Sequence, residues 1–179
     1  IQSGSDRMLA LMNRRYTLEE YRSIVRLIRE HLPEVGLTSD LIVGHPRETP
    51  EDFQCSVSAL EEFRFDLVHT AAYSPREGTA AAGWEEQVPG EIKMARLNEV
   101  NRLQSKIALE INSGLVGRTY PVLLDDFAPR GEGLLQGRTP SDKVVLVEAG
   151  EEMLGRMISV RITGAENWCL SGRILGTAE

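Results

Sequence analysis

A nearly continuous run of apolar and small residues, Val35 to Val43, leads directly into Gly44 and then into a helix start. Such a run is typical of a strand that is buried on both faces. Thr49 is placed to cap the following helix and Pro50 to occupy its first position. The buried stripe of this helix leads to a second predicted strand, Phe65 to Tyr73, and consists of Phe53, Val57, Leu60 and Phe63. The order strand, loop, helix, strand predicts a parallel α/β unit.

Further helices are predicted on both sides of this unit. Asp6 to Asn13 is short and amphipathic. Thr17 and Glu20 form the S/T-x-x-E capping box, and apolar residues then recur at helical spacing. Pro89 begins a long helix that ends near Gly114. The helices and strands together indicate repeated β/α units.

The two ends of the chain differ in character. The opening residues, IQSGSD, are typical of the end of a strand whose beginning is absent, so we expect residues 1–115 to be the C-terminal portion of a partial TIM-like (β/α) barrel. From Gly117 onward, short β-like runs alternate with turns: Thr119 to Leu124, Gly133 to Gly137, Lys143 to Glu148, Met157 to Thr163, and Trp168 to Ile174. We therefore expect a small five-stranded antiparallel β-barrel, OB-like, over residues 116–179.

Composition narrows the functional classes. With 41% hydrophobic and 26% charged residues, the chain has the composition of an ordinary globular protein, and no stretch has the apolar length of a membrane span. The start lacks a secretory pattern, so we expect a cytoplasmic protein without a membrane partner. The formal charge of -7 argues against broad adhesion to nucleic acid, but not against a local site. Cys55 and Cys169 form no metal or disulfide pattern and are expected to be small core residues.

In a barrel of parallel strands, the active site forms at the C-terminal ends of the strands. The first such end contains Gln2, Ser3 and Ser5, which can hydrogen-bond a ribose or an amino-acid head group, although Ser5 could simply cap a helix. The second contains His45 and Glu48, which are either an acid–base pair or a loop residue beside a helix start. No metal-ligand spacing and no nucleophile–base pattern is visible, so no catalytic residue is assigned.

Basic residues suggest two further binding regions. Arg14 and Arg15 precede the second helix and are free to reach a ligand. In the barrel segment a local RNA-binding patch is possible, with arginines on phosphates and an aromatic ring for stacking: Arg118, Arg138, Lys143, Arg161 and Trp168. The alternative is scattered solubilising charges and a tryptophan in the core.

Several stretches carry a family resemblance: QSGSDRMLALMNRRYTLEEY, SDLIVGHPRETPEDF and YSPREGTAAA in the first part of the chain. Together they closely resemble the radical S-adenosylmethionine methylthiotransferases. The tail is similar to the TRAM domain that ends those proteins, in VGRTYPVLL, GRTPSDKVVLVE and ITGAENWCLSG. Asn13 and the GRT...DKVV pattern favour the branch that modifies isopentenylated adenosine in tRNA over sister branches that act on threonylcarbamoyladenosine in tRNA or on a ribosomal protein. A non-catalytic RNA-binding module is the remaining alternative.

The resemblance implies a reaction and its cofactors. S-adenosylmethionine would be cleaved reductively, its 5′-deoxyadenosyl radical would take a hydrogen from adenine, and a methylthio group would be added at C2. Two 4Fe-4S clusters would serve S-adenosylmethionine cleavage and sulfur delivery, with ligands upstream of residue 1, so this chain alone is expected to be inactive. The expected partners are the anticodon stem-loop of tRNA and a reductant for the cluster.

The resemblance also assigns residues by motif. Those expected to contact S-adenosylmethionine are Gln2, Ser3, Ser5, Arg14, Val43, Gly44 and Tyr73. Those expected nearer the substrate or RNA are Arg15, Ser74, Arg76, Arg118, Arg138, Lys143 and Trp168. The family usually has GFPGET where this chain has His45 and Arg47, so the conformation of this loop is the main departure.

Overall fold

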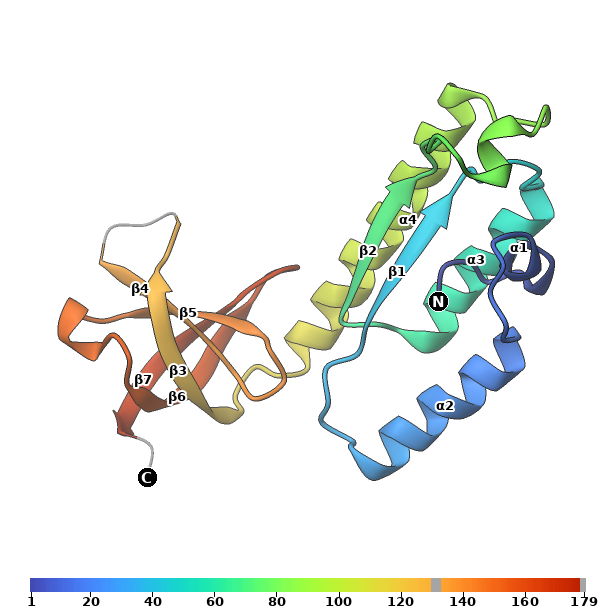
Figure 1. Ribbon diagram of the computed structural model, residues 1–179. Helices are drawn as coiled ribbons and strands as arrows, with labels where there is room; N and C mark the ends of the chain where they lie inside the picture. The colour runs from blue at the N-terminus through green and yellow to red at the C-terminus, as the bar shows by residue number, and fades with distance from the viewer. Residues whose placement is uncertain (130–132, 178–179) are drawn as a thin grey trace. The chain divides into compact units, whose positions relative to one another are not determined.

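The computed structural model describes residues 1–129 and 133–177 (Figure 1). The chain divides into two compact units. The first contains Ile1–Pro33 and Leu37–Ile107, and the second contains Glu34–Gly36 and Ala108–Glu179.

The first unit is built on two parallel strands, β1 (Thr38–Val43) and β2 (Leu67–Ala72). They pair in register from Thr38 opposite Leu67 to Val43 opposite Ala72. The helix α3 (Pro50–Phe63) connects them, which confirms the predicted order of strand, helix and strand. The other elements of this part of the chain are α1 (Asp6–Leu11), α2 (Leu18–His31), the short 3-10 helix η1 (Ala80–Gly83) and α4 (Gly90–Ser113).

Local signals explain where α2 and α3 begin. Both helices have a complete capping box, formed by Thr17 with Glu20 and by Thr49 with Asp52. Pro50 lies in the first turn of α3, where a missing N–H costs nothing. Helix α3 ends at Arg64, which adopts a left-handed conformation with φ 45°.

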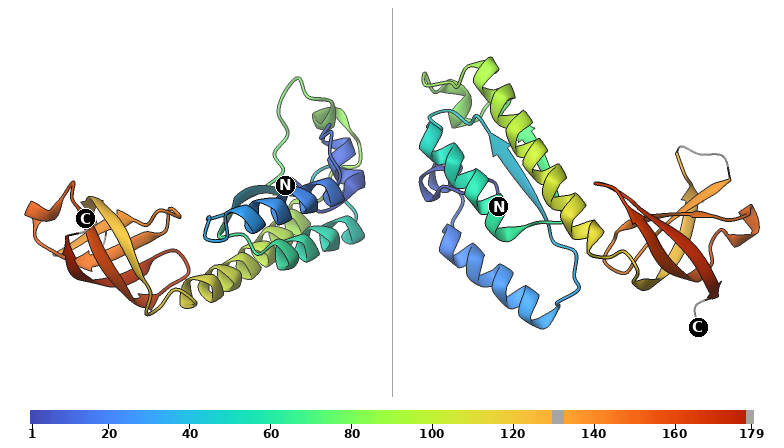
Figure 2. Two further views of the ribbon diagram at one scale, coloured as in Figure 1. Left: turned by 90° about the horizontal axis from the view of Figure 1, so that it is seen from below. Right: turned by 180° about the vertical axis from the view of Figure 1, so that it is seen from behind.

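Successive side chains of β1 point to opposite faces of the sheet. Helices α3 and α4 cover the same face (Figure 2), and Leu41 and Val43 point into the core beneath them. Ile42 points to the opposite face and is half-buried. The core residues of this unit come from all its longer elements: Val25, Leu41, Val43, Phe53, Val57, Leu60, Phe63, Phe65, Val68 and Val100.

The N-terminal segment runs along β1 and crosses α3 at very short range. The backbone N–H of Ile42 donates to the carbonyl of Gln2 at 3.1 Å. A Cβ added to Gly4 would lie 2.3 Å from the carbonyl oxygen of Cys55, so only glycine fits there. Gln2 thus lies beside β1 and is joined to it by one backbone hydrogen bond, although the segment forms no regular strand.

The second unit is a closed barrel in the order β3-β4-β5-β7-β6. Its strands are β3 (Thr119–Phe127), β4 (Leu134–Arg138), β5 (Val144–Glu148), β6 (Met157–Ala165) and β7 (Leu170–Thr177), with the 3-10 helix η2 (Glu151–Met153) before β6. The prediction of five strands is confirmed, but the prediction of an antiparallel barrel is wrong, because β5 and β7 pair in parallel. Five strands cannot alternate in direction around a closed ring, so at least one neighbouring pair must be parallel.

The barrel is filled by inward-facing aliphatic side chains: Val122, Leu124, Leu135, Val145, Val147, Ile158, Val160, Ile162 and Leu170. The two cysteines are not core residues, contrary to the prediction: Cys55 is exposed on α3 and Cys169 is half-buried. Burial statistics failed here because α3 turns position 55 away from its apolar stripe. Among the described residues, no helix is both long enough and apolar enough to cross a membrane.

Candidate functional site

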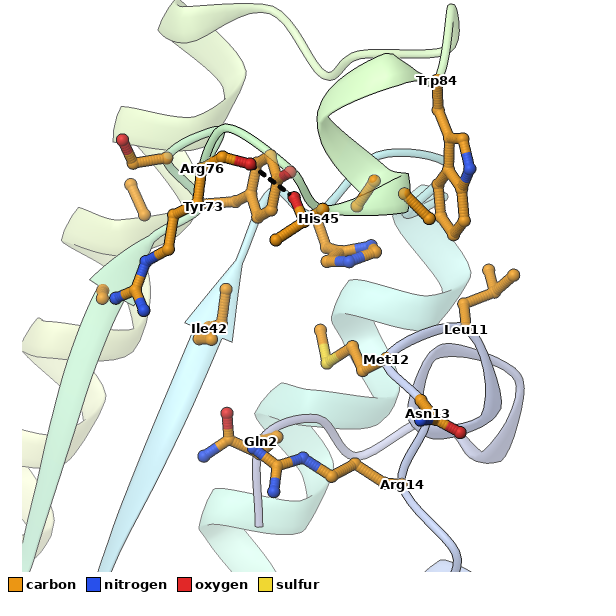
Figure 3. A pocket seen from close by; sticks show the side chains of 16 residues that line it. Gln2, Leu11, Met12, Asn13, Arg14, Ile42, His45, Tyr73, Arg76 and Trp84 are labelled. Carbon is orange, nitrogen blue, oxygen red and sulfur yellow. Dashed lines mark hydrogen bonds between the residues drawn. The ribbon is translucent and has the colours of Figure 1, made fainter.

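A cavity of about 860 Å³ lies at the C-terminal ends of β1 and β2, on the face that α3 and α4 leave open (Figure 3). We call it pocket A. Its apolar lining is Leu11, Met12, Ile42, Ala71, Ala72, Ala80, Ala81 and Trp84. Its polar lining is Gln2, Asn13, Arg14, His45, Tyr73, Ser74, Arg76 and Thr79. An apolar cavity with a few polar groups, of a volume within about 300–1,000 Å³, is typical of a small-molecule site.

His45 forms part of the wall between two aromatic side chains. Its ring lies edge-on to Tyr73 and to Trp84, with ring centroids 5.0 Å and 5.6 Å away. Its Nδ1 lies 3.0 Å from the carbonyl oxygen of Pro46. Burial lowers the pKa of His45; the Pro46 carbonyl opposes this shift, and the positive charge of Lys93 adds to it. The imidazole is therefore neutral at pH 7.

Glu48 does not pair with His45. Its Oε2 accepts a hydrogen bond from the N–H of Gly44 at 2.6 Å and forms an ion pair with Arg96 of α4. Burial raises the pKa of Glu48, and the Gly44 N–H and Arg96 oppose that shift. The carboxylate thus holds the loop after β1 in place, so the acid–base pair considered from the sequence is not formed.

Lys93 of α4 joins the ends of the two strands. Its ammonium donates to the carbonyl of Tyr73 at 3.2 Å and lies 5.1 Å from the centre of the Tyr73 ring. Gly44 has φ +71°, and a Cβ there would lie 2.4 Å from the Lys93 side chain. A glycine is thus needed at the end of β1 for both conformation and space.

Arg47 anchors the segment that carries Trp84. Its guanidinium lies 4.7 Å from the Trp84 ring centre and forms an ion pair with Glu86 at 3.1 Å, while its N–H donates to the Glu86 carbonyl at 2.9 Å. Arg47 adopts φ 69°. The loop in which this chain departs from the GFPGET pattern therefore contributes both a pocket residue, His45, and the contact that positions Trp84.

Residues 115–175 match the TRAM domain. The chain is 42% identical over 174 residues to the tRNA-2-methylthio-N(6)-dimethylallyladenosine synthase of Acetivibrio thermocellus, which covers 97% of this chain and 36% of that protein. Synthases of the same name from Dictyoglomus thermophilum and Syntrophomonas wolfei are 41% and 43% identical, over 98% and 97% of this chain and 40% and 39% of theirs. The chain is a homologue of these synthases and carries a TRAM domain.

The homology confirms the resemblance to the methylthiotransferases, and the chain spans only 36% to 40% of the length of these three relatives. The solution structure of a conserved protein from Methanococcus maripaludis is also similar, at 23% identity over 34% of this chain and 79% of that one, with a TM-score of 0.29. Within residues 1–129 and 133–177, no group of three or more His, Cys, Asp or Glu side chains is placed to hold a metal ion.

Five of the residues assigned by the resemblance line pocket A: Gln2, Arg14, Tyr73, Ser74 and Arg76. The lining of pocket A does not include the other residues assigned in the first unit: Ser3, Ser5, Arg15, Val43 and Gly44. Ser3 is fully buried, and its hydroxyl accepts from the N–H of Ser5 and contacts Ser56. Ser5 caps α1 and donates to Asp52 at 2.6 Å. Both hydroxyls are thus engaged inside the protein.

Val43 is completely buried in the core, so it can act on pocket A only through its backbone. Arg15 is exposed and lines a separate shallow hollow beside Glu19. The sequence assignments missed Trp84 and Met12, both of which line pocket A. A tryptophan in a loop of small residues was the available signal for the first, whereas nothing local distinguished Met12 from a core residue.

The residues assigned in the TRAM domain differ in their exposure and in their ion pairing. Arg118 and Trp168 are exposed, with 56% of the Arg118 side chain and 53% of Trp168 accessible, and Arg118 forms an ion pair with Glu34 at 3.5 Å. Arg138 bonds to Asp142 at 2.8 Å, which neutralises part of its charge. Lys143 is half-buried. The assigned residues thus differ in how freely they can meet a phosphate.

A pair of arginines on the TRAM domain has no acidic partner within the described residues. Arg161 of β6 lies directly opposite Arg173 of β7 and beside Thr119 of β3. Both arginines are exposed on the outer face, since Val160 and Ile162 point inward. Like charges directly opposite each other destabilise a sheet, and a bound anion would relieve this repulsion. Arg173 was missed because only the register reveals the pair.

Proposed function

We propose that this chain is part of a tRNA methylthiotransferase that adds a methylthio group to C2 of N6-isopentenyladenosine next to the anticodon. The observation that carries the proposal is the 42% identity to a tRNA-2-methylthio-N(6)-dimethylallyladenosine synthase along 97% of the chain. The similarity covers both the unit that holds pocket A and the TRAM domain. The enzyme would act in the cytoplasm.

The residues of pocket A fit S-adenosylmethionine. Arg14 and Gln2 lie near each other at one side of the cavity (Figure 3) and would hold the carboxylate and hydroxyl groups of the ligand. The apolar walls suit the adenine ring, and the Tyr73 side chain lines the same cavity. Its hydroxyl is buried and has no hydrogen-bond partner among the described residues. When bound, S-adenosylmethionine supplies the radical chemistry that breaks the C2–H bond of the substrate adenine.

In the proposed reaction, the residues of this chain would bind and orient S-adenosylmethionine and shield it from water. Trp84, held by Arg47, lines pocket A and would exclude water on that side. Gly44 and Val43 fix the end of β1 and would support the adenine ring through the backbone. Ser3 and Ser5 would act indirectly, by fixing the segment that presents Gln2. No residue of this chain is assigned a proton-transfer or nucleophilic role.

The 4Fe-4S clusters of such an enzyme would be held by other parts of the protein. This chain has two cysteines, too few for either cluster, because each site needs at least three thiolate ligands. The chain would therefore need a cluster-bearing partner region and a reductant in order to react. We expect it to be inactive alone.

The TRAM domain would bind the anticodon stem-loop of the tRNA. The arginine pair, Arg161 and Arg173, would contact phosphates. Arg118 would join them by exchanging its exposed ion pair with Glu34 for a phosphate. Trp168 is exposed enough to stack on an unpaired base. The substrate adenine would have to leave its stack to enter pocket A.

The test is nucleoside mass spectrometry of tRNA from a strain that lacks the gene. We expect 2-methylthio-N6-isopentenyladenosine to disappear and its unmethylthiolated precursor to accumulate, and the intact gene to restore it. A gene carrying Arg14→Gln should restore far less, whereas Arg26→Gln, a change on the exposed face of α2, should restore it fully. Persistence of the modified nucleoside in the deletion strain would refute the proposal.

Nucleoside analysis of the tRNA, together with mass spectrometry of the ribosomal proteins from the same strain, separates the alternatives. Loss of 2-methylthio-threonylcarbamoyladenosine instead would assign the sister tRNA activity, and loss of methylthiolation on a ribosomal protein would assign the sister protein activity. If no methylthio group is lost anywhere, the non-catalytic RNA-binding module is the better description.

A further inference from the structure

His45 offers a hydrogen-bond acceptor to pocket A that nothing in the protein uses. Its Nδ1 faces the carbonyl oxygen of Pro46 at 3.0 Å, and a carbonyl can only accept. Nδ1 therefore carries the hydrogen of the neutral ring, which leaves a lone pair on Nε2. No hydrogen bond reaches Nε2 from any residue that the structure describes.

The orientation of this acceptor is fixed. Tyr73 and Trp84 meet the His45 ring at interplanar angles of 67° and 78°, so they clamp it from two different segments of the chain (Figure 3). His45 itself is only 6% exposed. Turning the ring would break the bond to Pro46 and both edge-on contacts, so Nε2 cannot find a partner elsewhere.

Tyr73, which meets the His45 ring edge-on, also lines pocket A, and its buried hydroxyl has no hydrogen-bond partner among the described residues. The lining of pocket A also contains apolar side chains, among them Met12, Ile42 and Trp84, as well as polar ones such as Arg76 and Thr79. A ligand that complements this arrangement is flat and aromatic and carries an N–H donor at its edge. A 6-aminopurine has this shape and this donor, whereas a purine without the amino group has only the shape.

We propose that His45 is a specificity-determining residue of pocket A, whose Nε2 accepts a hydrogen bond from the exocyclic amino group of a bound 6-aminopurine. The inference rests on the proposed function, because both S-adenosylmethionine and the tRNA nucleoside carry such a group. The two ligands share this chemistry, and separate arms of the experiment distinguish them. Neutral His45 accepts and cannot donate at Nε2, so a 6-oxopurine is rejected.

The test measures binding of matched ligand pairs to the purified chain by titration calorimetry. One pair is S-adenosylhomocysteine and its analogue without the 6-amino group; the other is N6-isopentenyladenosine and its analogue in which oxygen replaces the 6-NH and the isopentenyl group is kept. We expect one pair to show a preference for the amino ligand of about five- to tenfold, the size of one neutral hydrogen bond. The pair that shows it identifies the source of the purine.

The key variant is His45→Phe, which keeps an aromatic ring between Tyr73 and Trp84 and removes the acceptor. We expect the preference to fall to within about twofold, with the deamino ligand binding as before. His31→Phe, the same change on the exposed end of α2, should leave the preference intact. In addition, the ¹⁵N signal of His45 Nε2 should move when the amino ligand binds, and not when its analogue does.

Retention of the preference in His45→Phe, or failure of both pairs to bind the folded wild-type chain, would overturn this inference. Neither result would bear on the nucleoside analysis of tRNA from the deletion strain. The proposed function can therefore survive the failure of this inference.

Discussion

The guanidinium of Arg96 and the carboxylate of Glu48 form an ion pair whose side chains are only 9% and 0% exposed. The pair links α4 to the loop after β1, because the same carboxylate oxygen accepts from the N–H of Gly44. One oxygen of Glu48, Oε1, has no hydrogen-bond partner. Removing only one partner of this ion pair should therefore lower the stability of the fold strongly.

Replacing Arg96 by Met should lower the free energy of unfolding by about 3–5 kcal/mol, since it leaves an unpaired buried carboxylate. Urea unfolding measures the loss. The double variant Arg96→Met with Glu48→Gln should recover part of it, because the uncompensated charge is then absent. Arg102→Met, on the exposed side of α4, is the control, and an equal effect there would contradict this account.

Asp52 should make the stability of the first unit sensitive to acid. Burial by itself would raise the pKa of Asp52, but hydrogen bonds from Arg7, Ser5 and Thr49 outweigh burial and hold the pKa well below its ordinary value. A folded pKa below the unfolded one contributes stability above the unfolded pKa of about 3.9, and this stability is lost as the pH falls toward the folded pKa.

Asp52→Asn should therefore lower the free energy of unfolding by about 2 kcal/mol at pH 7. The difference from the wild type should shrink below about pH 4. Unfolding curves between neutral and acid pH measure both quantities. Glu61→Gln, an exposed change on the same helix, should show neither effect; a constant difference at every pH would rule out the carboxylate as its source.

Gly4→Ala should destabilise the first unit by about 1–3 kcal/mol, the range for an overpacked site. The added Cβ would lie 2.3 Å from a backbone oxygen of α3, so the N-terminal segment must move away. In Gly90→Ala, at the first residue of α4, the added Cβ would have no neighbouring atom within 4 Å. This change should leave the stability unaltered or raise it slightly. Thermal unfolding compares the two, and equal melting temperatures would contradict the close approach.

The arginine pair predicts opposite effects on stability and on RNA binding. Replacing Arg161 and Arg173 by Gln should raise the free energy of unfolding by about 0.2–1 kcal/mol, because the repulsion is removed. RNA affinity should fall, and the slope of log K against log salt should decrease by about 2 for two lost phosphate contacts. Filter binding of an anticodon stem-loop at several salt concentrations measures this.

Arg138→Gln is the matched control for that experiment, since Asp142 already neutralises part of its charge. We expect a smaller change in the salt slope. If the double variant binds RNA as tightly as the wild type, the phosphate contacts of the TRAM domain lie on another face.

Much of pocket A was foreseeable from the sequence, because its residues follow strands that run in parallel. The C-terminal ends of such strands meet at one edge, and this places His45, after β1, in one cavity with Tyr73 and Arg76, after β2. Gln2 lines the same cavity, although no strand precedes it among the described residues. The motif resemblance added Arg14. The hydroxyls of Ser3 and Ser5 suggested ligand contacts from the sequence, whereas the structure turns them inward against α3.

The sequence by itself determined the helix starts, the strand count and the homology, because capping boxes, apolar periodicity and motifs act between residues close along the chain. Only the tertiary structure decided which distant residues meet. The packing of two loops placed His45 between Tyr73 and Trp84, and strand register set Arg161 opposite Arg173. The closure of five strands made one barrel pair parallel. These relations depend on register, ring closure and side-chain packing, none of which has a local sequence signal.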